Sequence, residues 1–356
     1  MNIALAFNQR GAEGDDPLPA PCTLHPQQTS SDLYAEWDDE QTIAAVASAL
    51  AQQHQVSLVN ADLDAFERLR GLKPDLVFNM SEGLFGGSRE SQIPALLEML
   101  QIPYTGSDPL TLGLCLDKYR TKEILSYNHI ATPDFVLIDN ADELPAHMSY
   151  PLLVKPPLEG SSKGITDSSL VRTPQELQRE LVRVRENYAQ QALVEEFLCG
   201  REFTVALLGN GTDVRVLPIV EIDFSTLPEG ANPIYSYEAK WLWDTDDDPL
   251  QIFHCPAPLE PLLRRSIEDL CRKAFNHLGC RDWCRIDVRL DSEGHPQIIE
   301  VNPLPGVLPR PEQNSCFPKA ARAAGLSYSE MILSVVDAAC ERLGLVEKNH
   351  AHRRLL

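Results

Sequence analysis

The chain has 356 residues, 43% of them hydrophobic, and a formal net charge of −21, which together predict a globular protein of two or three domains. The acidic balance, with no basic stripe, excludes nucleic acid as a partner, because that affinity comes largely from basic residues. No apolar run reaches the ~20 residues that a membrane span needs, and the opening MNIALAF lacks the basic flank of a signal peptide. We therefore expect a cytoplasmic protein without a membrane partner, its nine cysteines reduced.

The first third of the chain alternates between strand-like and helix-like segments. Strands are expected at 2–7, 55–60, 75–80 and 103–106, and helices at 42–53, between 60 and 75, and at 91–101. The polar stretch 9–31 is expected to be an extended loop, after which Asp38 or Asp39 can cap the first helix. This order predicts a Rossmann-like N-terminal α/β domain with a parallel sheet, residues 1–116.

The remainder divides into two further units and a tail. Strands at 135–139, 151–156 and 193–198, with an amphipathic helix at 173–188, suggest a small central domain over 117–194. A C-terminal domain, 195–346, should hold a mixed or antiparallel sheet. Its expected elements are strands at 201–210 and 213–224, a loop over 227–250, a helix at 259–279, a hairpin at 284–302 and a helix at 327–343, followed by a polar tail at 347–356.

The segment CRIDVRLDSEGHPQIIEVNPLPG, residues 284–306, predicts a polar site on one face of a hairpin. Strand side chains alternate between faces, so Arg285 and Asp287 share a side, as do Glu300 and Asn302. A turn centred on Glu293 and Gly294 would set Asp287 opposite Glu300. Carboxylate and amide oxygens of this kind suit Mg²⁺ with a nucleotide's phosphates. The alternative is a polar strand pair with a surface salt bridge.

Two further segments suggest nucleotide contacts. In PLLVKPPLEGSSKGI (151–165) a strand delivers Lys155, and the following Gly-Ser loop can turn its N–H groups toward phosphate. It lacks the order of a P-loop, and a plain turn is the alternative. In LVEEFLCGREF (193–203) the backbone of Glu196 and Leu198 could pair with a base while Glu202 accepts from ribose. Three exposed glutamates are the alternative there.

These segments together resemble the ATP-grasp ligases, and within them the D-alanine:D-alanine ligase family. The likeness covers nearly the whole chain, including DLVFNMSEG, LLEMLQIPYTGSDPLTLGLCLDKYRTKEIL, YEAKW and FPKAARAAGLSYSEMI besides the motifs above. It implies an α/β (α+β) fold of three domains with ATP between the central and C-terminal ones. By this resemblance the ATP-binding residues are Lys118, Lys155, Ser161, Ser162, Glu195, Glu196, Phe197, Leu198, Glu202 and Lys240.

The resemblance also implies the chemistry. ATP would phosphorylate a carboxylate, and an amine would attack the acyl phosphate to form an amide. Arg285, Lys240 and Ser162 would be catalytic, while Asp287, Glu300 and Asn302 would hold two Mg²⁺ ions, with Mn²⁺ as a substitute. The partners would be small-molecule substrates, and a homodimer is left open.

The departures from the family concern the amino-acid site. Residues 8–11 replace a glycine-rich turn and its ammonium-binding glutamate, Glu82 stands in place of a histidine, and Lys163 in place of an apolar residue. The stretch 305–311 replaces carboxylate-binding hydroxyls, and Trp241 replaces a tyrosine. The residues expected to contact substrate are Glu82, Trp241, Gly306 and Arg310.

Three functions follow from these observations. We expect a ligase that joins an amino acid to another small molecule in specialised biosynthesis, for example in pathways to mycosporine-like amino acids, where an enol oxygen would be phosphorylated. The alternative is a D-alanine:D-alanine ligase with a rearranged pocket. A nucleotide-binding module without catalysis is disfavoured by the complete set of Lys240, Arg285, Asp287, Glu300 and Asn302.

Overall fold

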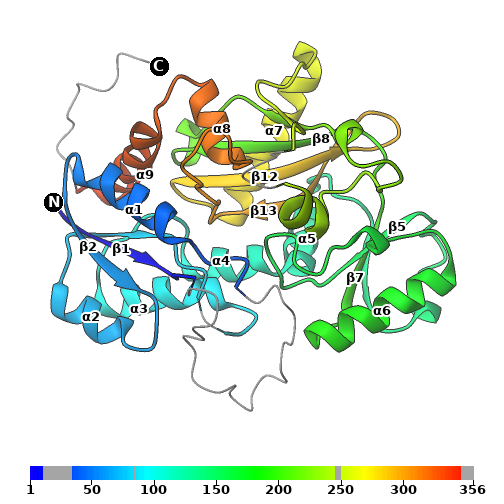
Figure 1. The fold of residues 1–356 in the computed structure, drawn as a ribbon, viewed down its shortest axis with the longest axis horizontal. Helices are drawn as coiled ribbons and strands as arrows, with labels where there is room; N and C mark the ends of the chain where they lie inside the picture. The colour runs from blue at the N-terminus through cyan, green and yellow to red at the C-terminus, as the bar shows by residue number, and fades with distance from the viewer. Residues whose placement is uncertain (11–33, 84, 245–249, 346–356) are drawn as a thin grey trace.

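The computed structural model describes residues 1–10, 34–83, 85–244 and 250–345. In these ranges the chain forms three sheets, each with helices against it (Figure 1). Most of the expected loop at 9–31 lies outside them, as does the tail at 347–356. None of the helices described is long and apolar enough to cross a membrane. Each cysteine in these ranges carries a free thiol.

The N-terminal sheet is parallel, as predicted, in the order β2-β1-β3. Its strands are β1 (Asn2–Phe7), β2 (Gln55–Asn60) and β3 (Leu76–Asn79), and its helices are α1 (Glu40–Ala51), α2 (Ala65–Leu72) and α3 (Gln92–Leu100). Asp39 caps α1 by accepting from the Thr42 N–H. The strand expected at 103–106 is wrong: only a single bridge from Val77 to Tyr104 forms there.

Two short helices, α4 (Pro109–Leu116) and α5 (Lys118–Tyr127), lead from this sheet to the central one. Asp108 caps α4 with Pro109 in its first turn, and Asp117 caps α5. Both caps are the residue types that begin helices. The break between the helices places Lys118, the first residue of α5, in a buried position.

The central sheet is antiparallel, in the order β4-β7-β5-β6. Its strands are β4 (Phe135–Ile138), β5 (Leu152–Lys155), β6 (Leu170–Val171) and β7 (Ala192–Glu196), and α6 (Pro174–Tyr188) packs on one face (Figure 1). Leu177, Leu181 and Val184 recur along α6 at helical spacing and are buried against the sheet.

The C-terminal sheet follows the order β11-β10-β8-β12-β13, with β9 paired to β8. These strands are β8 (Glu202–Leu208), β9 (Arg215–Val216), β10 (Val220–Ile222), β11 (Phe253–His254), β12 (Trp283–Leu290) and β13 (Pro296–Asn302). The strand expected over 213–224 is therefore two short strands. The loop expected over 227–250 contains a π-helical turn, Ala239–Trp243.

Three helices complete this region: α7 (Pro261–Leu278), α8 (Cys316–Ala323) and α9 (Tyr328–Leu343). No helix was expected at 316–323, where α8 forms. One hydrophobic core joins the N-terminal sheet to α8 and α9, and α1 packs against α9. Trp283 is at its centre, with ring centroids 5.6 Å from both Phe78 and Phe317. This shared core fixes the N-terminal sheet beside the hairpin.

Candidate active site

The β12–β13 hairpin has the predicted register. Asp287 is opposite Glu300, and Arg285 is opposite Asn302. A bulge after Asp287 absorbs one extra residue of β13, so the pairing at the polar end is kept. The turn closes at Gly294, whose φ of +85° favours glycine.

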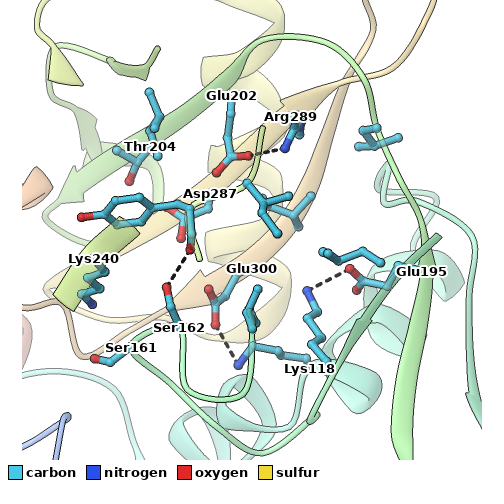
Figure 2. A pocket seen from close by; sticks show the side chains of 18 of the residues that line it. Lys118, Ser161, Ser162, Glu195, Glu202, Thr204, Lys240, Asp287, Arg289 and Glu300 are labelled. Carbon is cyan, nitrogen blue, oxygen red and sulfur yellow. Dashed lines mark hydrogen bonds and ion pairs between the residues drawn. The ribbon is translucent and has the colours of Figure 1, made fainter. Parts of the chain in front are cut away.

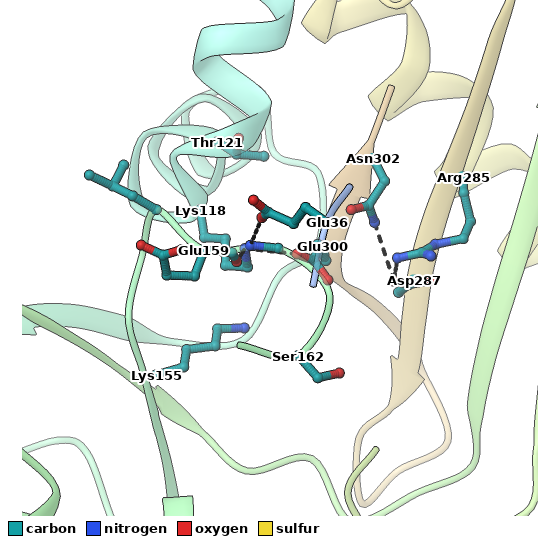
Figure 3. A network of polar contacts seen from close by, with 12 residues as sticks. Glu36, Lys118, Thr121, Lys155, Glu159, Ser162, Arg285, Asp287, Glu300 and Asn302 are labelled. Carbon is teal, nitrogen blue, oxygen red and sulfur yellow. Dashed lines mark hydrogen bonds and ion pairs between the residues drawn. The ribbon is translucent and has the colours of Figure 1, made fainter. Parts of the chain in front are cut away.

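The carboxylates of the hairpin are paired with cations. Lys118 Nζ lies 2.8 Å from Glu300, and Arg285 lies 2.9 Å from Asp287. Burial raises the pKa of Glu300, but the charges of Lys118 and Arg285 outweigh it and lower the pKa to about 2. Burial raises the pKa of Asp287. Figure 3 shows Asn302, Arg285 and Asp287 together on the hairpin, with Lys118 beside Glu300.

These oxygens can hold Mg²⁺ only together with oxygens from a ligand. Within the described ranges, no three His, Cys, Asp or Glu side chains are grouped to hold a metal. Asp287 and Glu300 supply two carboxylates, and Asn302 lies beside them, with its amide 3.3 Å from Asp287. Mg²⁺ commonly takes one or two carboxylates and completes its shell with water and phosphate. The donor set therefore fits Mg²⁺ bound together with a nucleotide.

The Gly-Ser loop contacts the π-helical turn and the segment that leads into it. Ser161 and Ser162 have φ of 51° and 60°, the left-handed region that non-glycine residues seldom adopt. Ser162 Oγ donates to the Tyr235 carbonyl at 3.0 Å, and Trp241 Nε1 donates to the Ser161 carbonyl at 3.2 Å. Burial and the neighbouring Arg285 lower the pKa of Lys240, on the turn, to about 8.

The second predicted lysine, Lys155, ends β5 and is held by Glu195. That carboxylate lies 2.8 Å from Lys155 and 3.0 Å from Lys122. Burial and the adjacent Lys155 lower the pKa of Lys122 to about 8 although Glu195 opposes the shift. The Glu195 side chain thus positions lysines, and its carboxylate is already engaged.

A cavity between the central and C-terminal sheets brings most of the predicted residues together (Figure 2). It contains the predicted phosphate lysines, both serines of the loop and both hairpin carboxylates. The predicted residues that line it are Lys118, Lys155, Ser161, Ser162, Glu195, Glu196, Phe197, Leu198, Glu202, Lys240, Arg285, Asp287 and Glu300.

One of the backbone groups predicted to contact a base, the Glu196 N–H, is already engaged. β7 is an inner strand between β4 and β5, and the Glu196 N–H donates to the Asp134 carbonyl at 2.9 Å. An N–H already bonded inside a sheet is not available to a base. The Phe197 N–H also donates, to the Pro151 carbonyl at 3.3 Å, so the predicted base contact is left to the Glu196 carbonyl and the backbone of Leu198.

The remaining predicted residues do not line this cavity. Asn302 faces an adjoining small pocket with Glu90. The ring centroid of Trp241 lies 5.4 Å from Lys240 Nζ. The structure places Glu82 close to Glu90, and burial and Glu90 together raise the pKa of its carboxyl. Gly306 accepts from Ser315 through its carbonyl, and the Arg310 N–H donates to Gln313.

Sequence reasoning missed a buried group of charges that we call the loop anchor: Glu36, Arg89, Glu159 and Lys163. Arg89 donates to both oxygens of Glu36 at 2.6 to 3.1 Å, and Lys163 lies 2.6 Å from Glu159. Glu36 also accepts from the Gly160 N–H at 2.7 Å. A Cβ at Gly160 would come within 2.6 Å of that carboxylate, so the approach requires glycine. No spacing in the sequence joins these segments.

Two other residues that were missed could have been placed from the periodicity of the sequence. Arg289 follows Asp287 by two positions on β12, so strand alternation places it on the same face. Lys122 follows Lys118 by four positions on α5, which places both lysines on one side of the helix. Periodicity would have found both.

The fold matches that of a solved structure of D-alanine–D-alanine ligase from Bacillus anthracis complexed with ATP. The TM-score is 0.70 at 22% sequence identity, covering 97% of this chain and 98% of that one. A likeness at this identity shows the fold, which is the ATP-grasp fold. With the relatives below, it defines the class: an ATP-dependent ligase that forms carbon–nitrogen bonds.

The sequence comparisons identify the family within this class. The family model described as D-ala D-ala ligase C-terminus matches residues 123–337. A D-alanine–D-alanine ligase of Bordetella petrii is 33% identical over 95% of this chain and 92% of its own length. An uncharacterised Sinorhizobium fredii protein, y4sG, is 36% identical over 86% of this chain and 89% of its own length. The chain belongs to the D-alanine–D-alanine ligase family.

Proposed function

We propose that this enzyme uses ATP and Mg²⁺ to join an amino acid to another small molecule through a phosphorylated intermediate, an acyl phosphate for a carboxylic acid or an enol phosphate for a cyclic ketone, and that its substrates are not two D-alanines. The observation that carries the chemistry is the convergence of Lys118, Lys240 and Arg285 on the Asp287–Glu300 pair in one cavity. Its positive groups suit phosphate, and its opposed carboxylates call for a cation. No protein nucleophile is needed for this reaction.

In this proposal each residue acts by charge and position. Lys118 and Lys155 neutralise phosphate oxygens, the loop at Ser161 and Ser162 covers them, and Lys240 approaches from the π-helical turn. Asp287, Glu300 and Asn302 would hold Mg²⁺, two ions with Mn²⁺ as a substitute, whose bound charge screens the triphosphate. Arg285 stabilises the oxyanion that develops when the amine attacks.

Mg²⁺ bound together with a nucleotide would change the ion pairs of the hairpin carboxylates. In the structure, Glu300 and Asp287 are neutralised by Lys118 and Arg285. If Mg²⁺ takes the carboxylates, Lys118 and Arg285 become free to bind anionic oxygens of the substrates. The two ion pairs therefore keep buried charges balanced before ligands arrive.

The proposal on substrate depends on the loop anchor and the residues near it. Arg89 and Lys163 already neutralise Glu36 and Glu159, so Glu36 is not a free carboxylate for a substrate ammonium. Beside it, Glu82 and Glu90 are close together, and burial raises the pKa of Glu90 to about 7 even though Arg89 opposes it. The pairing of Glu36 with Arg89, which leaves that carboxylate engaged, is what supports an acyl or ketone partner without an α-ammonium group. A cyclohexenone, as in mycosporine-like pathways, is one member of that class.

A D-alanine–D-alanine ligase is the second candidate, because curated relatives that cover most of the chain carry that name. The test is a screen of single amino acids, and of amino acids paired with carboxylic acids or cyclic ketones, for ADP release with Mg·ATP. Mass analysis of the product accompanies each pair. We expect little ADP and little dipeptide from D-alanine alone. Robust dipeptide formation with D-alanine as the sole amino acid would instead establish the second candidate.

A further inference from the structure

Arg289 is buried in the wall of the cavity and has no role in the proposed chemistry. It lies on β12 opposite Glu202 of β8 in the antiparallel register. Its Nη1 donates to Glu202 Oε2 at 2.9 Å, and its Nε donates to the Gly200 carbonyl at 3.2 Å. Figure 2 shows the two side chains joined at the upper edge of the cavity.

Aromatic rings also fix the guanidinium. Its central carbon lies 4.6 Å from the ring centroid of Phe197 and 5.2 Å from that of Phe224. Both distances fall within the range of cation–π attraction. With two hydrogen bonds and two rings, Arg289 has little freedom to rotate, and a planar guanidinium held in this way presents its donors in a fixed direction.

The contact leaves one oxygen of Glu202 for a ligand. Within the described part of the chain, Glu202 accepts a hydrogen bond only at Oε2, and the residue lines the cavity. Burial raises the pKa of Glu202, and Arg289 opposes that shift. The other charges that act on it are Asp287 on β12, which raises its pKa, and Lys155 on β5, which lowers it. An ionised carboxylate is an acceptor only, which suits hydroxyl donors.

We propose that Arg289 is a positioning residue that aims the Glu202 carboxylate at the sugar hydroxyls of the nucleotide and makes the site selective for ribonucleotides over 2′-deoxyribonucleotides. The inference rests on the proposed function, because it takes a nucleotide to occupy this cavity. A buried acceptor held in one orientation is left unpaired when the hydroxyl is missing, and sites of this kind reject the deoxy ligand. A carboxylate free to turn away would discriminate less.

The test measures binding of Mg·ADP and Mg·2′-deoxy-ADP to the whole protein by calorimetry, so that no second substrate or turnover is needed. For the natural chain we expect 2′-deoxy-ADP to bind about tenfold more weakly or worse. Arg289→Met keeps an apolar stem beside the rings. In this variant ADP binding should weaken about tenfold, and the ratio of the dissociation constants of 2′-deoxy-ADP and ADP should fall below about threefold. Arg289→Lys should recover part of the ratio.

The matched control is Arg201→Met. Arg201 also pairs with a glutamate of the same sheet, Glu221, and lies 5.1 Å from the ring of Phe203, but it is largely exposed and does not line the cavity. Its loss should leave both affinities unchanged. Glu202→Gln should reduce the ratio like Arg289→Met, and the double variant should add nothing further if Arg289 acts through Glu202.

The outcomes separate this inference from the proposed function. If the natural chain fails to bind Mg·ADP, the proposed function falls and this inference falls with it. If the natural chain binds ADP selectively but Arg289→Met and Glu202→Gln keep the same ratio, only the role of Arg289 is overturned. Additive losses in the double variant would also overturn it, since Arg289 would then contact the ligand independently. Should Arg289→Met lower the melting temperature sharply, Glu202→Gln and Arg289→Lys still decide the question.

Discussion

Two groups of largely buried charges meet at the Gly-Ser loop and differ in how their members are satisfied. The first, which we call the cavity cluster, comprises Lys118, Arg285, Asp287 and Glu300 and faces the cavity. The second is the loop anchor. Each cluster balances two cations with two anions, but their surroundings differ in whether a ligand can replace one of the partners.

In the cavity cluster the cations and anions face open space that a ligand can enter. In the loop anchor the partners come from three chain segments and also use backbone groups. Arg89 donates to the Leu158 carbonyl, and Gln190 donates to Glu159. The first cluster can exchange partners with a ligand, whereas the second holds the loop in place. Similar charge pairs therefore serve binding in one place and loop geometry in the other.

The largest expected effect comes from breaking the cavity cluster. Asp287→Asn or Glu300→Gln removes anionic charge proposed to hold Mg²⁺, and ADP release with the true substrates should fall about 10²- to 10³-fold. Glu293→Gln is the control, since this glutamate is exposed at the tip of the same hairpin. Either cavity variant keeping more than about half of its activity would contradict the assignment.

Breaking the loop anchor should act on stability. Arg89→Met leaves Glu36 buried without its main partner, and the free energy of unfolding should fall by about 3 to 5 kcal/mol in chemical denaturation. The double variant Glu36→Gln with Arg89→Met should lose less, because no lone charge stays buried. Arg68→Met, which breaks an exposed pair with Asp62, should cost under about 1 kcal/mol. Equal losses at Arg68 and Arg89 would show that the anchor is no stronger than a surface pair.

Acid titration compares one acid from each cluster. Burial raises the pKa of Glu36, but the charges of Arg89 and Lys163 outweigh burial and lower this pKa from 4.5 to about 2. The pKa of Glu300 is also lowered to about 2. A group whose pKa is lowered in the folded state stabilises that state fully above pH 4.5, and this contribution to the free energy of unfolding is lost as the pH falls through about 2. It amounts to about 3 kcal/mol for each group. The difference in unfolding free energy between the natural chain and Glu36→Gln should therefore shrink between pH 4.5 and 2, and a constant difference would refute the pairing.

The smallest expected effect lies outside both clusters, at Arg310. If its guanidinium binds the carboxylate of the incoming amino acid bidentately, Arg310→Ala should raise the KM for that amino acid about tenfold or more, with the KM for ATP nearly unchanged. Arg310→Lys should give an intermediate value, because the charge remains without the fork. Equal KM values in Arg310→Ala and the natural chain would refute this contact.

Local pattern determined much of this protein. Strand alternation in the sequence put Arg285 on the face of Asp287 and Asn302 on the face of Glu300, because the side-chain period of a strand is a property of the backbone alone. The turn and the bulge after Asp287 then set Asp287 opposite Glu300. The parallel N-terminal sheet followed in the same way from apolar strands alternating with helices. The same reasoning overextended 103–106 to a strand, since a four-residue segment has no periodicity to test.

Only the tertiary structure decided the partners of the buried charges. Glu36 meets Arg89 and Gly160, and Glu202 meets Arg289, because sheet register and the shared core bring distant segments together. No period in the sequence encodes such pairs, although burial without a partner would be very costly. The sequence by itself determined which chemical groups the cavity would contain. The packing of the three sheets decided which of them are engaged with each other and which are left for a ligand.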